Sequence, residues 1–191
     1  MRTDWVIRPE EPADYDQIRE MTLAAFAAAY GTGPAEVALM DGLRADPEAY
    51  DPALALVAAR GALVLGNVML SRVSIEGTAG RWPAVCVAPL GVRIGHQRQG
   101  IGGALLRAGL EAARARGYRI AVLEGSPAYY GRFGFEDAVP HGITDSLGGP
   151  APYFMAAELV PGAFRGVAGE VRYPPIFAVV APSEPPSPPP A

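Results

Sequence analysis

The segment from Val92 to Leu106, VRIGHQRQGIGGALL, constrains the fold more than any other part of the chain. The apolar strand expected at 84–92 runs into a turn with four glycines nearby, and an amphipathic helix expected at 100–116 follows at once. The N-terminus of a helix exposes backbone N–H groups and carries partial positive charge. Glycines also let a ligand approach the backbone closely. The segment therefore fits a diphosphate-binding turn, although the glycines alone equally fit a tight strand-to-helix connection.

Several other phosphate and metal sites are excluded by residue content. Leu105 stands where a dinucleotide-binding fingerprint would have its last glycine. Every one of the 16 basic residues is Arg, so neither a Walker-type nucleotide site nor a Schiff-base lysine can form. A single Cys excludes an internal disulfide and a Cys-based zinc site, and the two His lie far apart in the chain. We therefore expect no metal.

Composition favours one globular domain with a cytoplasmic location. Half of the 191 residues are hydrophobic, and the net charge is −4, which gives no electrostatic reason to expect a nucleic-acid or membrane partner. Met1 to Glu10 has no apolar core of a signal peptide, and no apolar run is long enough to span a bilayer. Residues 1–181 are expected to form the domain. The Pro-rich stretch 182–191 is expected to be a disordered tail.

The hydrophobic periodicity predicts a mixed α/β domain with one sheet flanked by helices. Asp14 is the expected N-cap of a first helix that ends at Gly31, with Gln17 completing a capping box. An irregularity is expected at Gly66, and Pro89 should force a bulge or splay in its strand. Strands are expected at 5–8, 54–59, 63–75, 84–92, 119–123, 153–160 and 167–173, and further helices at 35–45, 100–116 and 127–133. The expected buried face of the helix at 100–116 comprises Ile101, Ala104, Leu105, Ala108, Ala112 and Ala115.

Two motifs in this order resemble a known family. Gln97-Arg98-Gln99-Gly100-Ile101-Gly102 matches the Q/R-x-x-G-x-G/A signature of the GNAT superfamily of acetyl-CoA-dependent N-acetyltransferases, and Tyr130 to Phe135 resembles its Y-x-x-x-G-F segment. Upstream, Leu90-Gly91-Val92 looks like the splayed strand of that family. The resemblance covers about residues 5–160. It implies a mixed, mostly antiparallel central sheet with a splayed strand, flanked by helices.

The resemblance also implies roles for individual residues. Backbone N–H groups from Arg98 to Gly103 would hold the CoA pyrophosphate, and the main chain from Leu90 to Val92 would bind the pantetheine arm and thioester. Tyr130 would be the general acid that protonates the departing thiolate. The implied cofactor-binding residues are Leu90, Gly91, Val92, Gln97, Arg98, Gln99, Gly100, Ile101, Gly102, Gly103 and Ser126.

The general base is less clear, because the strand at 84–92 carries neither Glu nor Asp. Glu124 is the nearest ionisable residue by motif, but a solvated strand-end carboxylate is an alternative interpretation, and a water chain could also accept the proton. Cys86 is expected to be a core thiol. His96 is expected to be a loop residue, with a phosphate contact as the alternative, and His141 a structural residue. Arg132 is expected to be solvated, with a contact to the adenine 3′-phosphate as the alternative. Only one of the adjacent Tyr129 and Tyr130 should face the thioester.

The expected function is transfer of the acetyl group of acetyl-CoA to a primary amine by direct attack in a ternary complex. The acceptor could be a small molecule or a peptide, with helices between Asp14 and Ala45 walling its pocket. A homodimer is left open. The alternative is a non-catalytic acyl-CoA-binding or regulatory module of the same fold, and a weaker one is a nucleotide-binding domain.

Overall fold

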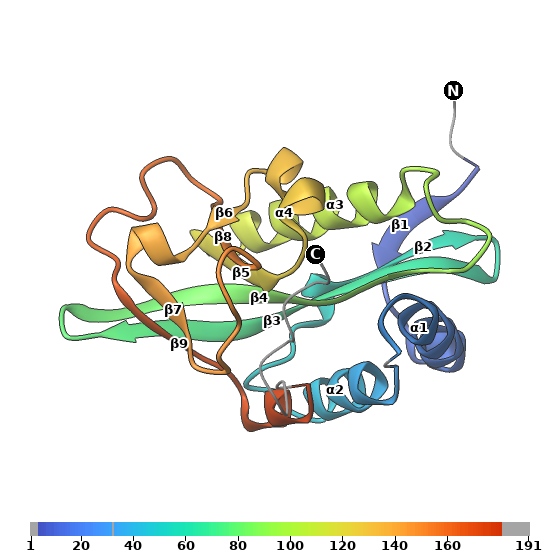
Figure 1. Cartoon of the computed structure of the whole chain (residues 1–191). Helices are drawn as coiled ribbons and strands as arrows, with labels where there is room; N and C mark the ends of the chain where they lie inside the picture. Colours follow the sequence, from blue (N-terminus) through green and yellow to red (C-terminus); the bar gives the residue numbers. More distant parts are fainter. Residues whose placement is uncertain (1–3, 32, 181–191) are drawn as a thin grey trace, which may run out of the picture.

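The computed structural model describes residues 4–31 and 33–180 (Figure 1). The tail predicted at 182–191 lies outside the described residues. A long β-hairpin made of β3 (Leu63–Gly77) and β4 (Gly80–Val92) forms the middle of the sheet. The other elements are placed against this hairpin.

The sheet runs in the order β1-β2-β3-β4-β5-β8-β6. All neighbours in this path are antiparallel except β4 and β5, which are parallel. β9 pairs with the distal half of β3, and β7 pairs with β9. The predicted mixed, mostly antiparallel sheet is therefore confirmed. The remaining strands are β1 (Val6–Pro9), β2 (Ala55–Arg60), β5 (Ile120–Glu124), β6 (Glu136–Asp137), β7 (Ile143–Asp145), β8 (Phe154–Glu158) and β9 (Gly169–Arg172).

Helices cover both faces of the sheet (Figure 1). α1 (Tyr15–Tyr30) and α2 (Pro34–Arg44) lie on one face, and α3 (Ile101–Ala115) and α4 (Pro127–Tyr130) lie on the other. Alternation along each strand sends successive side chains to two separate cores. The short 3-10 turns are η1 (Pro12–Asp14), η2 (Pro52–Leu54), η3 (Gly131–Phe133), η4 (Val139–His141) and η5 (Pro175–Val179).

Both predicted strand irregularities are present. The β2–β3 register shifts between Ala58 and Ala59, which pair with Gly66 and Val64 and leave an extra residue on β3. The β3–β4 register shifts around Pro89, where β4 carries one residue more than β3. Because proline cannot donate to the ladder, the bulge interrupts the β3–β4 pairing, which resumes with Leu90 opposite Val68 and continues to Val92 opposite Gly66.

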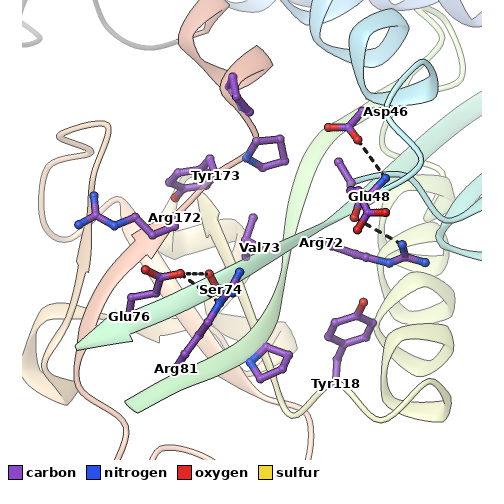
Figure 2. A pocket seen from close by; sticks show the side chains of 14 residues that line it. Asp46, Glu48, Arg72, Val73, Ser74, Glu76, Arg81, Tyr118, Arg172 and Tyr173 are labelled. Carbon is purple, nitrogen blue, oxygen red and sulfur yellow. Dashed lines mark hydrogen bonds and ion pairs between the residues drawn. The ribbon is translucent and has the colours of Figure 1, made fainter. Parts of the chain in front are cut away.

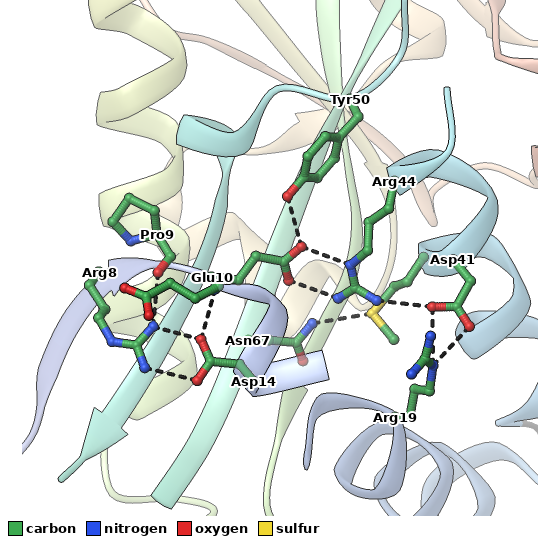
Figure 3. Close-up of polar contacts among 11 residues, drawn as sticks. Arg8, Pro9, Glu10, Asp14, Arg19, Asp41, Arg44, Tyr50 and Asn67 are labelled. Carbon is green, nitrogen blue, oxygen red and sulfur yellow. Dashed lines mark hydrogen bonds and ion pairs between the residues drawn. The ribbon is translucent and has the colours of Figure 1, made fainter. Parts of the chain in front are cut away.

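The predicted capping box of α1 is wrong. Asp14 makes no cap bond to α1. Its carboxylate instead accepts hydrogen bonds from the Arg8 guanidinium at 2.6 and 2.8 Å and from the Glu11 backbone N–H at 2.9 Å, which belongs to the preceding η1 turn (Figure 3). Gln17 reaches the β2–β3 hairpin, where its amide accepts from Val64 N–H and donates to the carbonyl of residue 62. An ion pair with Arg8 replaced the local cap.

The predicted buried face of α3 is only partly right. Ala115 is exposed. Two glycines also belong to the buried face. Gly109 lets α3 approach β3 closely, because a Cβ there would lie 2.7 Å from Leu70 Cδ1, whereas Gly103 lies against Phe133. Arg107 does not pair with Glu111 but stacks over an aromatic ring of the η3 turn. The buried residues of α3 are Ile101, Gly103, Leu105, Leu106, Gly109 and Ala113.

A buried ion pair fixes α2 to the start of the chain (Figure 3). Arg44 at the end of α2 donates to both carboxylate oxygens of Glu10 at 2.8 Å, and the two side chains are only 7% and 1% exposed. The Tyr50 hydroxyl donates to the same carboxylate at 2.9 Å. The Tyr15 ring lies 4.1 Å below the guanidinium. The α1–α2 pair is thereby held in a fixed place beside the sheet.

Candidate active site

A cavity of about 1240 Å³ passes through a gap between β4 and β5. These parallel strands pair only at Val85 with Ala121 and at Cys86 with Val122. Beyond Cys86 both strands line the cavity, β4 with its segment 87–92 and β5 with Glu124. The splayed strand that Pro89 predicted is therefore present, and it opens the sheet to both faces.

The glycine-rich turn forms one end of this cavity. Arg98 and Gly100 have φ values of +59° and +85°, so the backbone folds through the left-handed region just before α3 begins at Ile101. Gly100 has open space around the position of a Cβ, so conformation rather than crowding requires glycine there. The Gln97 amide donates to Val92 O at 3.2 Å, which closes the loop onto the end of β4.

Aromatic side chains of α4 and η3 cover the first turn of α3. A Cβ on Gly102 would lie 3.0 Å from the Tyr129 hydroxyl, and one on Gly103 would lie 3.2 Å from Phe133 Cζ. Arg132 stacks over the Tyr129 ring at 4.3 Å. Arg132 is exposed, as predicted, and lies beside the turn, where it stacks on an aromatic ring.

Most sequence-predicted cofactor residues line the cavity. Two do not: Gln99, which is exposed and donates to Gly95 O, and Ile101, whose side chain is 1% exposed in the core beneath α3. Only the backbone N–H of Ile101 faces the turn as a helix N-terminal group. The predicted residues that line the cavity are Leu90, Gly91, Val92, Gln97, Arg98, Gly100, Gly102, Gly103, Glu124, Ser126 and Tyr130.

Tyr130 and Glu124 lie on opposite faces of the sheet. Tyr130 packs with the α3-side core and against Gly125, at the end of β5. On β5, Ile120 and Val122 belong to the α1–α2-side core, so alternation places Glu124 on that side. The gap between β4 and β5 joins the two faces.

A second carboxylate, Asp145 of β7, accompanies Glu124. A Cβ on Gly149 would lie 2.5 Å from Asp145 Oδ2 and 3.4 Å from Glu124 Oε2, so both oxygens flank the same point. Glu124 remains accessible to solvent, but the cavity walls remove part of its hydration, and this desolvation, with the charge of Asp145, raises its pKa. Burial likewise raises the pKa of the Cys86 thiol nearby, which keeps it protonated as the predicted core thiol.

Sequence reasoning missed Asp145 and the apolar wall near it. Asp145 falls in a Gly/Pro-rich stretch that reads as a loop, and its carboxylate accepts from the N–H groups of Leu147 and Gly149, which is a turn signature. No local pattern marks a cavity residue there. The helices between Asp14 and Ala45, which the sequence analysis expected to wall a pocket, line the cavity with Ala25, Phe26, Ala29, Glu36 and Leu39. Other lining residues that the sequence did not indicate are Leu147, Tyr153, Tyr173, Phe177 and Val180.

A smaller cavity of about 440 Å³ is lined mainly by the segment after α2, the distal half of β3, the start of β4 and the chain at the end of β9 (Figure 2). Its charged groups are largely paired with each other or with backbone: Arg81 contacts Glu76 at 3.0 Å, and Arg72 donates to the carbonyl of Pro47 at 3.1 Å. Tyr173 lines both cavities. The glycine turn and the paired carboxylates belong to the larger cavity, which is therefore the candidate active site.

The two histidines lie outside the larger cavity. His141 pairs with Glu136 at 3.1 Å and stacks on Phe164, in agreement with a structural role. Within the described residues, no group of three or more His, Cys, Asp or Glu side chains could hold a metal ion. None of the helices in that part of the chain combines the length and apolar character needed to cross a membrane.

Comparisons with known proteins agree with this geometry. A family model described as "Acetyltransferase (GNAT) domain" matches residues 6–138. The chain is similar to the uncharacterized N-acetyltransferase YhbS of Escherichia coli K12, with 36% identity over 110 residues, which is 58% of this chain and 65% of that protein. It is also similar to the uncharacterized N-acetyltransferase YjhQ of the same strain, with 32% identity over 78% of this chain and 76% of the relative.

Two solved structures are similar over nearly the whole chain. The crystal structure of E. coli YhbS in complex with CoA has a TM-score of 0.81 at 32% identity and covers 93% of this chain and 96% of its own. A GNAT family acetyltransferase from Brucella melitensis in complex with acetyl-CoA has a TM-score of 0.73 at 33% identity and covers 91% and 97%. With the family model spanning residues 6–138, this chain belongs to the GNAT acetyltransferase family.

Proposed function

We propose that this protein transfers the acetyl group of acetyl-CoA to a primary amine by direct attack in a ternary complex. One observation carries the proposal: a single cavity crosses the sheet between β4 and β5, with a glycine turn at a helix N-terminus on one face and carboxylates on the other. The CoA- and acetyl-CoA-bound structures of the E. coli and Brucella relatives support the choice of acyl donor.

The residues present fit acetyl-CoA. Arg98, Arg107 and Arg132 all line the α3-side part of the cavity and would compensate phosphate charge. The backbone N–H groups at the start of α3 are suited to the pyrophosphate. Because pairing of β4 with β5 ends at Cys86, the edge of segment 87–92 that faces β5 is open to the amide groups of the pantetheine arm.

The chemistry proposed here divides the two proton transfers between the two faces. The amine nitrogen attacks the thioester carbonyl, a C–N bond forms and the C–S bond breaks. Tyr130 donates its phenolic proton to the departing sulfur, since a phenol with a pKa of about 10 matches a thiol with a pKa of about 8.5. Glu124, or water that it orders, first accepts one proton from the ammonium, because only the neutral amine can attack. The second proton that nitrogen loses as the amide forms returns through water to the Tyr130 phenolate. The raised pKa of Glu124 brings it closer to the range that suits a base.

The test is release of free thiol from acetyl-CoA, followed with a panel of primary amines. Turnover that depends on both acetyl-CoA and an amine supports the proposal. Tight calorimetric binding of acetyl-CoA without thiol release for any amine would instead support the alternative, a non-catalytic acyl-CoA-binding module. Absence of acetyl-CoA binding would contradict both.

A further inference from the structure

The larger cavity separates positive from negative charge. Its three guanidinium groups come from the turn before α3, from α3 and from η3. Its three carboxylates are Glu36 of α2, Glu124 at the end of β5 and Asp145 of β7. Arg and carboxylate side chains therefore line different ends of one continuous space.

We propose that the acceptor is a primary amine carried on an apolar, arylalkyl-type body that bears no carboxylate. This inference rests on the proposed acetyl transfer and names the class of acceptor. An ammonium group entering the carboxylate end gains Coulombic attraction from Glu124 and Asp145. The neutral amine needed for attack then forms when its proton passes to that end.

Backbone groups hold the Asp145 carboxylate in place at this end of the cavity. Asp145 Oδ2 accepts from Gly149 N–H at 2.7 Å and Oδ1 accepts from Leu147 N–H at 3.1 Å, so the side chain is held by backbone. Burial raises the pKa of Tyr173, and the neighbouring Asp145 charge adds to this, so the phenol stays protonated and can donate to the carboxylate. Glu124 lies beside Asp145, and a cation between them relieves their mutual repulsion.

The rest of this end is apolar. Its walls come from both helices of the α1–α2 pair, from the segment after β7 and from η5. A wall of this kind accepts hydrocarbon or an aromatic ring, because removing apolar surface from water is favourable. The apolar residues concerned are Ala25, Phe26, Ala29, Leu39, Leu147, Tyr153, Phe177 and Val180.

A carboxylate on the acceptor has no cationic partner at this end. Among the described residues that line the cavity, Arg is confined to the glycine-turn end, and no His lines it. The α-carboxylate of an amino acid would face Glu36, Glu124 and Asp145 in a partly desolvated space. Like-charge contacts of this kind suppress binding strongly. The pocket therefore discriminates an amine from the amino acid that has the same side chain.

The experiment compares acceptors that differ only in the carboxylate. Thiol release from acetyl-CoA is measured with phenethylamine against phenylalanine and with tryptamine against tryptophan. We expect kcat/KM for each amine to exceed that for its amino acid by about 100-fold or more. Spermidine, a polycation without an aromatic body, should be a poorer acceptor than either aromatic amine. Equal or better use of an amino acid, or of spermidine, overturns the inference.

A variant pair tests the assignment to Asp145. Asp145→Asn should lower kcat/KM for phenethylamine by about tenfold and reduce the discrimination against phenylalanine, while the calorimetric Kd for acetyl-CoA stays unchanged. The matched control is Glu20→Gln, the same type of neutralisation at an exposed position of α1. Unchanged discrimination in folded Asp145→Asn overturns the inference.

Failure of the inference and failure of the proposed function have different signatures. If acetyl-CoA is turned over only with amino acids or with amines that carry an uncharged polar body, the proposed acetyl transfer is correct and the proposed acceptor class is wrong. If acetyl-CoA binds but a broad amine panel releases no thiol, the proposed function is wrong and the inference falls with it.

Discussion

The rings of Tyr129 and Tyr130 stand nearly perpendicular, with planes at 81° and centroids 4.9 Å apart. Their sequence neighbourhood is the same, but their surroundings are not. The Tyr129 hydroxyl lies over Gly102 at the start of α3, whereas the Tyr130 ring packs against Gly125 and Phe135 near the end of β5. One tyrosine therefore belongs to the glycine turn and the other to the gap between the strands.

This difference predicts distinct effects for two matched variants. Tyr130→Phe keeps the ring and removes the proton donor, so kcat should fall by about 10²–10⁴-fold with little change in the Kd for acetyl-CoA. Tyr129→Phe should act on acetyl-CoA affinity and leave the chemical step nearly intact. Steady-state kinetics under conditions where chemistry limits the rate, with calorimetry for binding, separate the two. Wild-type turnover by Tyr130→Phe would reassign the acid to Tyr129 or to water.

Gly102 provides a test of the glycine turn. A Cβ there would lie 3.0 Å from the Tyr129 hydroxyl and 3.3 Å from Val92 Cγ2, so Gly102→Val must displace both walls of the turn. We expect a raised Kd for acetyl-CoA in a protein that is still folded by circular dichroism. The matched control is Gly131→Ala, because Gly131 has nothing within 4 Å of its Cβ position. Equal affinity in folded Gly102→Val would contradict the assignment of the turn.

The carboxylate pair predicts a pH dependence. Desolvation and the charge of Asp145 raise the pKa of Glu124, and a base acts in its deprotonated form. Activity should therefore rise with pH through a midpoint above the ordinary range of a glutamate. Asp145→Asn removes one cause of the shift, so it should move that midpoint to lower pH. Glu124→Gln should abolish the rise of kcat/KM with pH. If the rise survives in Glu124→Gln, it reports the titration of another group.

The Glu10–Arg44 pair predicts a large loss of stability. Both side chains are buried, so Glu10→Ala leaves the Arg44 guanidinium with Asp41, at 3.1 Å, as its remaining carboxylate partner, and should lower the free energy of unfolding by about 3 kcal/mol. Arg81→Ala breaks the exposed pair with Glu76 and should cost no more than about 1 kcal/mol. Denaturant unfolding measures both. Similar losses for the two variants would show that burial does not govern the α2 anchor.

The sequence predicted the features that depend on local chemistry. Pro89 cannot take part in a regular central β-ladder, so the irregularity in β4 could be predicted. The glycines before α3 mark a strand-to-helix turn, so the turn that follows β4 could be predicted as well. Asp145 could not be found in this way, because β7 is short and its place beside Glu124 arises only when β7, β8 and β9 assemble. The Asp14 cap failed for a related reason: Arg8, on another element, competes for its carboxylate.

The short pairing of β4 with β5 has a mechanical consequence. The sheet is two sections joined directly through Val85–Ala121 and Cys86–Val122, one section built on the β3–β4 hairpin and the other on β5 and β8. A molecule that lies in the gap contacts both sections and adds interactions between them. If acetyl-CoA occupies the gap as proposed, its binding should slow amide exchange in β5 and β8 as well as in the glycine turn, and so stabilise the junction between the two sections of the sheet.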